Sequence, residues 1–411
     1  MSAYLDHAAT TPVRPEVAEV YRQELSRLGN PSALHTAGRA ARARVEEARE
    51  QLAAAVDADP AEVLFTSGGT EADNLAVKGA YWARRAADPA RTAVAVSAIE
   101  HHAVLEAASW LGEHEGAEVL ELPVAPSGAL DPAGVETAFD RGDLALASIM
   151  WANNETGVIQ PIAELAARAR HAGVPLHSDA VQAIGKVPVR FHASGVDALS
   201  LTGHKVGAPV GTGALIARRD FAMTPVEHGG GQERGVRSGT LSVAEASALA
   251  LAVELAVAVQ EAEAQRLAAL RDRLLGAAAT IEGVAVTGPV ENRGITEWLP
   301  SHAHLTVAGA DADALLAGLD MAGVAASSGA ACQSGVQQPS HVLTAMGYRG
   351  EQARAAVRFS LGHTSTEDDV DAALAVLEQV AGAARRVFDA GRGSARRAAA
   401  TSRTPVHPGS L

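Results

Sequence analysis

The chain has 411 residues and a formal net charge of -14, with 47% hydrophobic and 20% charged residues. Its length exceeds what one hydrophobic core usually supports, so we expect two lobes. The acidic balance disfavours nucleic acid or an anionic membrane as a partner, because either would repel the chain as a whole.

No segment of the sequence is predicted to be a leader or a membrane span. Residues 1–10 lack a basic region followed by an apolar run, and the most apolar stretch, 248–259, is short and interrupted by Glu254. We therefore expect a cytoplasmic protein. The only cysteine, Cys332, excludes an internal disulfide and a cysteine-rich metal site, and we expect no metal. A lone cysteine is more often an inert buried residue than a nucleophile.

Strand-like and helix-like segments alternate through the middle of the chain. Apolar-periodic stretches at 39–56 and 162–172 suit helices. This alternation is typical of βαβ units, so we predict an α/β fold whose large domain holds a mostly parallel seven-stranded sheet. The predicted strands are 63–66, 92–97, 118–122, 144–150, 175–178, 198–201 and 213–217.

A long helical pattern at 242–279 comes next and is predicted to link the two lobes. Strand signals follow at 284–287, 304–307 and 355–360, and a capping box at 364–367 opens a last helix that ends near Phe388. We expect a large domain over 16–262 and a small α+β domain built from 1–15 and 263–390. The segment 391–411, rich in Gly, Ser, Arg, Ala and Pro, is predicted to be a disordered tail.

Three polar segments each follow a predicted strand. In the first, 65–74, glycines precede a helix start and let backbone amides approach an anion, although a tight turn with a helix cap explains them equally well. In the second, Asp179 ends a strand where α/β proteins bind ligands, or else it is a helix N-cap. In the third, Lys205 follows a buried strand between Gly203 and Gly207, and is either a surface charge or an amine that forms a Schiff base.

Taken together, the three segments match one cofactor. Pyridoxal 5'-phosphate needs a lysine for its aldehyde, a carboxylate for its ring nitrogen and a helix terminus for its phosphate. Lys205, Asp179 and the segment 65–74 offer these groups, and Thr202 and His204 add donors for the phosphate. The interval from Asp179 to Lys205 leaves room for one helix and one strand. The sequence therefore predicts a pyridoxal phosphate site.

Further motifs appear in order along the chain, and with them the sequence resembles a known family. It is similar to the cysteine desulfurases, in the class V aminotransferase group of the fold-type-I pyridoxal-phosphate-dependent transferases, over nearly its whole length. Besides the Lys205 segment, the resemblance rests on YLDHAATTP at 4–12, GNPS at 29–32, EHHA at 100–103, NNETG at 153–157, GGGQERGVRSGT at 229–240 and RFSLG at 358–362.

The resemblance implies a role for each matching residue. Lys205 would form the Schiff base, Asp179 would pair with the ring nitrogen, and His101 would stack on the ring and is a candidate for proton transfer. Arg358 would grip the substrate carboxylate as a bidentate pair. On the residues alone, His101 could be part of a surface pair and 153–154 a turn. Further contacts implied by the resemblance come from Gly69, Thr70, Asn154, Gln182, Thr202 and His204, with Asn154 also near the substrate and Thr240 reaching in from the second subunit of a homodimer.

Small residues surround Cys332 at 327–335 and favour an exposed loop over a core position. The resemblance implies that this cysteine accepts sulfur from L-cysteine as a persulfide, leaving L-alanine. It would then pass the sulfur to acceptor proteins such as an iron–sulfur cluster scaffold, where Cys332 could also contact the cluster. The stretch 333–341 resembles the longer-loop subgroup of the family.

Two other functions stay open at this point. A selenocysteine lyase, or another enzyme of the class V aminotransferase type, would share Lys205 and Asp179 without needing a loop thiol. A non-catalytic scaffold that relays sulfur would need neither residue. The intact set of Lys205, Asp179 and Arg358 argues against the scaffold.

Overall fold

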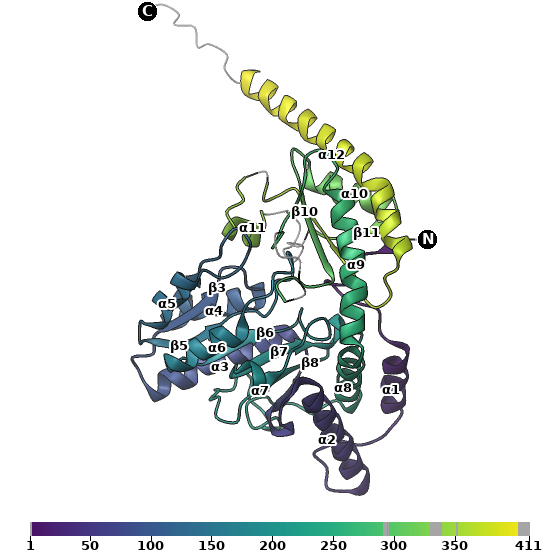
Figure 1. Cartoon of the computed structure of the whole chain (residues 1–411). Helices are drawn as coiled ribbons and strands as arrows, with labels where there is room; N and C mark the ends of the chain where they lie inside the picture. Colours follow the sequence, from purple (N-terminus) through teal and green to yellow (C-terminus); the bar gives the residue numbers. More distant parts are fainter. Residues whose placement is uncertain (1, 291–293, 295, 329–338, 351, 402–411) are drawn as a thin grey trace, which may run out of the picture.

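A seven-stranded sheet forms the centre of the larger part of the molecule (Figure 1). The computed structural model describes residues 2–290, 294, 296–328, 339–350 and 352–401, with side chains up to residue 390. In the order β2-β8-β7-β6-β5-β3-β4, β8 is antiparallel to both of its neighbours and the other pairs are parallel. The predicted α/β sheet is confirmed. Its strands are β2 (Val63–Thr66), β3 (Ala93–Ser97), β4 (Glu118–Leu122), β5 (Leu144–Ser148), β6 (Leu176–Asp179), β7 (Ala198–Thr202) and β8 (Gly213–Ala217).

Helices cover both faces of this sheet, and the buried strands are apolar along most of their length for that reason. Adjacent residues of β2 face opposite cores: Phe65 packs with residues of α2, α6 and α8, whereas Leu64 packs with residues of α3 and α4. Alanine-rich faces let α8 lie close to α1 and α2. The helices of this part are α1 (Pro15–Leu25), α2 (Thr36–Val56), α3 (Gly69–Ala87), α4 (His102–Glu115), α5 (Pro132–Phe139), α6 (Ile162–His171), α7 (Phe191–Ser194) and α8 (Val243–Ala258).

The single long helix predicted over 242–279 is two helices, and that prediction is wrong. α8 ends at Ala258, α9 (Gln260–Ala278) begins two residues later, and the pair is bent by 71°. Val259 has φ -106° and ψ 3° and breaks the helical backbone there. The bend lets α8 pack on α1 and α2 while α9 packs on the second sheet. Packing into two separate cores therefore outweighs the helical propensity that runs through this part of the sequence.

A smaller α+β layer lies above the large sheet in Figure 1 and packs against α9. Its antiparallel sheet has the order β12-β10-β9, and β1 pairs in parallel with β11. A separate core joins Leu5 with residues of α9, α10 and α12. This distribution of cores supports the predicted division into 16–262 and 1–15 with 263–390, which we propose for the chain. The elements are β1 (Ala3–Tyr4), β9 (Val284–Val286), β10 (His302–Val307), α10 (Ala312–Met321), β11 (Val324–Ala325), α11 (His341–Ala345), β12 (Ala356–Ser360) and α12 (Glu367–Thr401).

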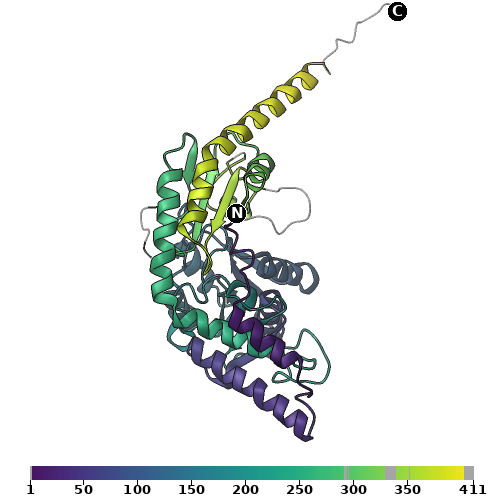
Figure 2. The ribbon, with the colours of Figure 1, turned by 90° about the vertical axis from the view of Figure 1, so that its right-hand side faces the viewer.

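The last helix is longer than the sequence suggested. α12 continues to Thr401 and extends away from the rest of the molecule (Figure 2). A disordered tail was expected from residue 391, and for 391–401 this expectation is wrong; residues 402–411 lie outside the described part of the chain. Alanine and arginine dominate 391–400 and are among the strongest helix formers, so their propensity outweighs the two glycines there.

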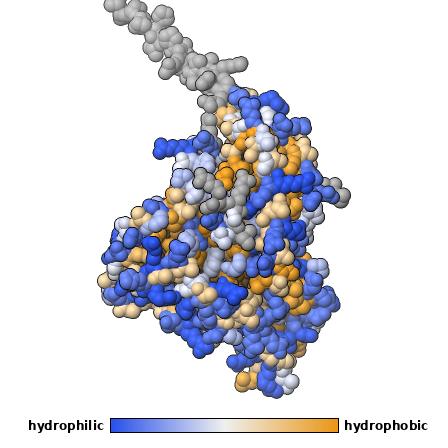
Figure 3. All heavy atoms as spheres, viewed as in Figure 1, coloured by the Kyte–Doolittle hydropathy of each residue, from blue (hydrophilic) through white to orange (hydrophobic). Residues whose placement is uncertain are grey.

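Hydrophilic residues are not spread evenly over the surface. Hydrophilic residues cover most of the lower half of the face shown in Figure 3. Within the described residues, no single helix is long and apolar enough to cross a membrane, and only the bent pair of α8 and α9 reaches that length and apolarity.

Candidate functional site

A pocket of about 380 Å³ lies at the carboxyl ends of β6 and β7, where open α/β sheets bind ligands. Residues from both layers line it, including Ala8 and Ala9 of the N-terminal segment and Ser327 of the smaller layer. The structure brings ten of the twelve predicted site residues together here: Gly69, Thr70, His101, Asn154, Asp179, Gln182, Thr202, His204, Lys205 and Arg358.

One end of the pocket is the N-terminus of α3, which begins at Gly69. The first backbone N–H groups of a helix have no partner within it, and they attract anions. A Cβ on Gly69 would come within 2.8 Å of the Val181 side chain, so only glycine fits this close approach. One hydroxyl and one imidazole border the same end, and both have protein partners here: Thr202 Oγ1 donates its only proton to the Thr212 carbonyl oxygen at 3.0 Å, and His204 Nδ1 lies 3.3 Å from Thr10 Oγ1. This end suits a phosphate group.

A pair of buried carboxyl groups lies in the pocket wall. Asp179, at the end of β6, is 5% exposed and accepts a hydrogen bond from the Val181 backbone N–H at 2.8 Å. Burial raises its pKa to about 6, against the opposing effects of that hydrogen bond and of the Lys205 charge. Asp73, on α3, is 1% exposed, and burial together with the Asp179 charge raises its pKa well above the ordinary value. Because Asp179 has a cation nearby, we assign the negative charge to it and the proton to Asp73.

The amine of Lys205 lies at the mouth of this pocket. Its Nζ donates to the carbonyl oxygens of Ala8 and Ala9, both at 2.6 Å. Burial and the Lys205 charge lower the pKa of His101 to about 4, so this imidazole is neutral at pH 7. His101 Nδ1 accepts from the Ala103 backbone N–H at 3.1 Å, which leaves the ring proton on Nε2. The pocket therefore combines an amine, a carboxylate and a neutral imidazole.

Arg358 enters from β12 and is 4% exposed. Its Nη2 donates to Asp6 Oδ1 and its Nη1 to the Asn154 carbonyl oxygen, each at 2.8 Å. Its buried Nε has no hydrogen-bond partner among the described residues. A guanidinium that still has a free donor in a pocket suits recognition of a carboxylate.

The sequence did not predict two residues of the site. Asp6 and Asp73 both lie inside quoted motifs, but nothing in those motifs distinguishes them from turn or helix residues. Asp6 pairs with Arg358, 352 positions away, and Asp73 lies 3.7 Å from His177. For Asp73, helical spacing could have indicated its place in the site. It stands four positions after Gly69, so both residues lie on the same face of α3.

Two predicted residues are not part of the pocket. Thr240 lines a separate small cavity with Thr66 and Arg237, so its expected contact through a second subunit stays a prediction. Cys332 and the longer-loop stretch 333–338 lie outside the described residues. Among the described residues that line the pocket, Ser327 is the one nearest to Cys332 in the sequence, five positions before it.

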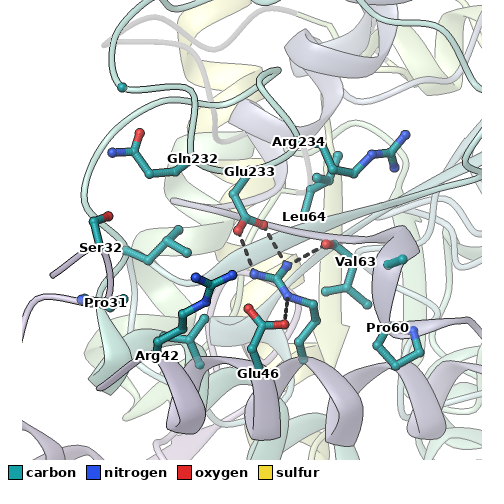
Figure 4. A pocket seen from close by; sticks show the side chains of 15 residues that line it. Pro31, Ser32, Arg42, Glu46, Pro60, Val63, Leu64, Gln232, Glu233 and Arg234 are labelled. Carbon is teal, nitrogen blue, oxygen red and sulfur yellow. Dashed lines mark hydrogen bonds and ion pairs between the residues drawn. The ribbon is translucent and has the colours of Figure 1, made fainter. Parts of the chain in front are cut away.

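A second cavity, larger than this pocket, lies elsewhere and has a different character. It measures about 760 Å³ and lies between α2 and the 229–241 segment (Figure 4). Arg49 forms a bidentate pair with Glu233 at 2.7 and 2.8 Å across its floor. None of the predicted site residues lines it. We therefore assign the chemistry to the smaller pocket, where the titratable groups converge.

Comparisons with known proteins identify the family of this chain. The Aminotransferase class-V family model matches residues 3–373, and the chain belongs to that family, which is pyridoxal-phosphate-dependent in general. Within it, the chain belongs with the cysteine desulfurases.

The IscS-like cysteine desulfurase of Mycobacterium tuberculosis is 51% identical over 96% of this chain and 100% of that relative. The cysteine desulfurase IscS of Dictyoglomus turgidum is 41% identical over 92% of this chain and 94% of its own. A solved NifS-like protein from Rickettsia africae is 31% identical, covers 92% of this chain and 99% of its own, and has a TM-score of 0.81.

The residues present fit pyridoxal phosphate. The volume of about 380 Å³ is in the ordinary range for a small-ligand pocket. Arg358 Nε is buried without a hydrogen-bond partner among the described residues, as expected of a group that binds a ligand. The helix terminus, the Asp179 carboxylate and the Lys205 amine supply the three kinds of group that this cofactor requires.

Proposed function

We propose that this chain removes sulfur from L-cysteine with pyridoxal phosphate bound in the pocket of Lys205 and Asp179. One observation carries the proposal: a lysine amine, a buried carboxylate and a helix N-terminus line a single pocket. When bound, the cofactor would act as an electron sink for the carbon that loses its proton. The desulfurase names of the relatives support cysteine as the substrate.

Each wall of the pocket would hold a different part of the ligands. Lys205 would hold the cofactor aldehyde, and its released amine would take the α-proton of the substrate. Asp179 would bind the ring nitrogen, and the neutral His101 would stack on the ring and can move a proton at Nε2. Arg358 would bind the substrate carboxylate. The remaining predicted contacts are Gly69, Thr70, Thr202 and His204 on the phosphate and Asn154 and Gln182 on the ring oxygen.

Cys332 would receive the sulfur. Its thiolate would attack the substrate sulfur, the carbon–sulfur bond would break, and the carbon would take up a proton, so that cysteine and the Cys332 thiol become alanine and a persulfide. We further propose a homodimer in which Thr240 completes the neighbouring site, transfer of the sulfur to acceptor proteins such as an iron–sulfur scaffold, and a cytoplasmic location.

The lysine content of the chain allows a direct test of the cofactor site. The sequence has three lysines, at 78, 186 and 205. Borohydride reduction of the purified protein, followed by peptide mapping, should fix the cofactor to Lys205, with Lys78 and Lys186 as internal controls. A colourless protein that is not labelled would favour the non-catalytic scaffold, and a label on Lys186 would contradict the assignment of the amine.

A second experiment tests the sulfur acceptor. Cys332→Ser should keep the cofactor absorbance but form no protein-bound persulfide from ³⁵S-labelled cysteine. Unchanged alanine production by this variant would contradict the role of Cys332 and favour a selenocysteine lyase or another class V enzyme, since these need no loop thiol.

A further inference from the structure

Lys186 is a second lysine at this site, and the proposed function does not use it. It lies in the turn that follows β6, and its Nζ donates to two acceptors of one residue: the Gln182 carbonyl oxygen at 3.1 Å and Gln182 Oε1 at 3.0 Å. Within the described residues, no carboxylate forms an ion pair with it. Only three of the 34 lysine and arginine residues are lysines, and two of these three, Lys186 and Lys205, lie near this pocket.

These contacts decide which way the Gln182 amide faces. When protonated, the Lys186 amine has only donors, so it must face the amide oxygen and not the amide nitrogen. Burial and the Lys205 charge lower the Lys186 pKa to about 7, so the protonated form dominates below pH 7. On the other side, Gln182 Nε2 donates to the Ala8 carbonyl oxygen at 3.0 Å. Reversing the amide would set donor against donor at Lys186 and acceptor against acceptor at Ala8. Both ends of the amide therefore specify one orientation.

The same carbonyl oxygen links this arrangement to the reactive amine. Ala8 O accepts from Lys205 Nζ at 2.6 Å as well as from Gln182 Nε2, which uses both of its lone pairs. Gln182 is 5% exposed and lines the pocket, and one of its two amide hydrogens is used at Ala8. The other hydrogen of the correctly turned amide is available to a ligand in the pocket.

We propose that Lys186 is a positioning residue that holds the Gln182 amide with its nitrogen toward the pocket, so that Gln182 donates a hydrogen bond to an oxygen of the bound cofactor. This inference rests on the proposed function, because it needs the cofactor in this pocket. Lys186 touches Gln182 and acts only through it.

Cofactor affinity and absorbance test this role without relying on turnover. Apo-protein would be titrated with pyridoxal phosphate for the wild type, Lys186→Met, Lys186→Arg, Gln182→Ala and the double variant of Lys186→Met with Gln182→Ala. Loss of a donor to an anionic oxygen should raise the dissociation constant about ten-fold in Lys186→Met and shift the absorption band. Lys186→Arg keeps a donor-only cation and should retain the wild-type band. Lys78→Met, which removes a lysine that lies over the Trp110 ring and does not line this pocket, is the matched control.

The double variant distinguishes positioning from general damage. If Lys186 acts through Gln182, adding Lys186→Met to Gln182→Ala should change the dissociation constant by less than about two-fold. An equal ten-fold loss in both backgrounds, or no loss in Lys186→Met alone, would overturn the inference. Failure of the proposed function looks different, because the wild-type protein itself would then show no cofactor band.

Discussion

The buried ion pair of Arg49 and Glu233 gives the most quantitative test of the packing around the 229–241 segment (Figure 4). Replacing Arg49 by Met removes a guanidinium, 8% exposed, that donates to both Glu233 carboxylate oxygens and to the Val63 carbonyl oxygen. The Glu233 carboxylate, 4% exposed, would keep the Phe65 backbone N–H at 2.8 Å as its remaining donor among the described residues. Removing one partner of a buried pair costs about 3–5 kcal/mol, because the other charge stays buried and uncompensated.

Differential scanning calorimetry would measure this cost. If the larger part of the chain unfolds as one unit of about 250 residues, its unfolding entropy is on the order of 0.5 kcal/mol per kelvin, so the melting temperature should fall by about 6–10 °C. Arg141→Met is the matched control. Arg141 is also bidentate to a carboxylate, Glu118, at 2.8 and 2.6 Å, but its charge is exposed and screened by water. Equal melting temperatures for the two variants would refute the argument from burial.

Three more changes have outcomes set by single features of the structure. Glu155→Gln should raise the stability of the protein above pH 7. Burial raises the Glu155 pKa from 4.5 to about 7, so between these two pH values the folded state holds a proton that the unfolded chain releases. The contribution of Glu155 to stability therefore falls as pH rises and is lost above pH 7. A pH series of urea midpoints that is parallel for variant and wild type would contradict this. Gly157→Ala should destabilise the protein by about 2 kcal/mol, because a Cβ at φ +77° would meet the His302 side chain at 2.6 Å. Gly142→Ala is the control and should cost less, because its φ of +78° is similar but the space around it is open. Equal urea midpoints for the two variants would rule out the clash. Thr240→Ala should weaken cofactor binding in the proposed homodimer without altering its sedimentation, and unchanged affinity would remove Thr240 from the site.

The strands of the large sheet could be predicted because each is a short apolar run that ends in polar residues. Helices bury both faces of the sheet, so neighbouring residues such as Leu64 and Phe65 both had to be apolar. The bend at Val259 could not be predicted in this way. No glycine or proline marks it, and its cause is the position of two cores that are distant in the sequence.

Most of the pocket was predictable for a topological reason. Parallel strands end at the same edge, so Asp179 at the end of β6 and Lys205 after β7 had to come near one another. The partners that complete the site were not predictable, because each contact joins segments far apart in the sequence. Two such contacts depend on side-chain geometry, for which the sequence carries no periodic signal. They are the ion pair of Asp6 with Arg358 and the hydrogen bond of Lys186 with the Gln182 amide.

The N-terminal segment explains how two layers with separate cores make one site. Its residues contact the larger layer through the Ala8 and Ala9 carbonyl oxygens on Lys205, and the smaller layer through Asp6 on Arg358. Its backbone is fixed on both sides, since the His7 N–H donates to the Ser360 carbonyl oxygen at 3.2 Å and the Thr11 N–H to that of His204 at 2.9 Å. The amine and the guanidinium are therefore held at a set separation by six consecutive residues, Asp6 to Thr11. A ligand that needs both groups at once requires that separation, so this short segment contributes directly to the geometry of the pocket.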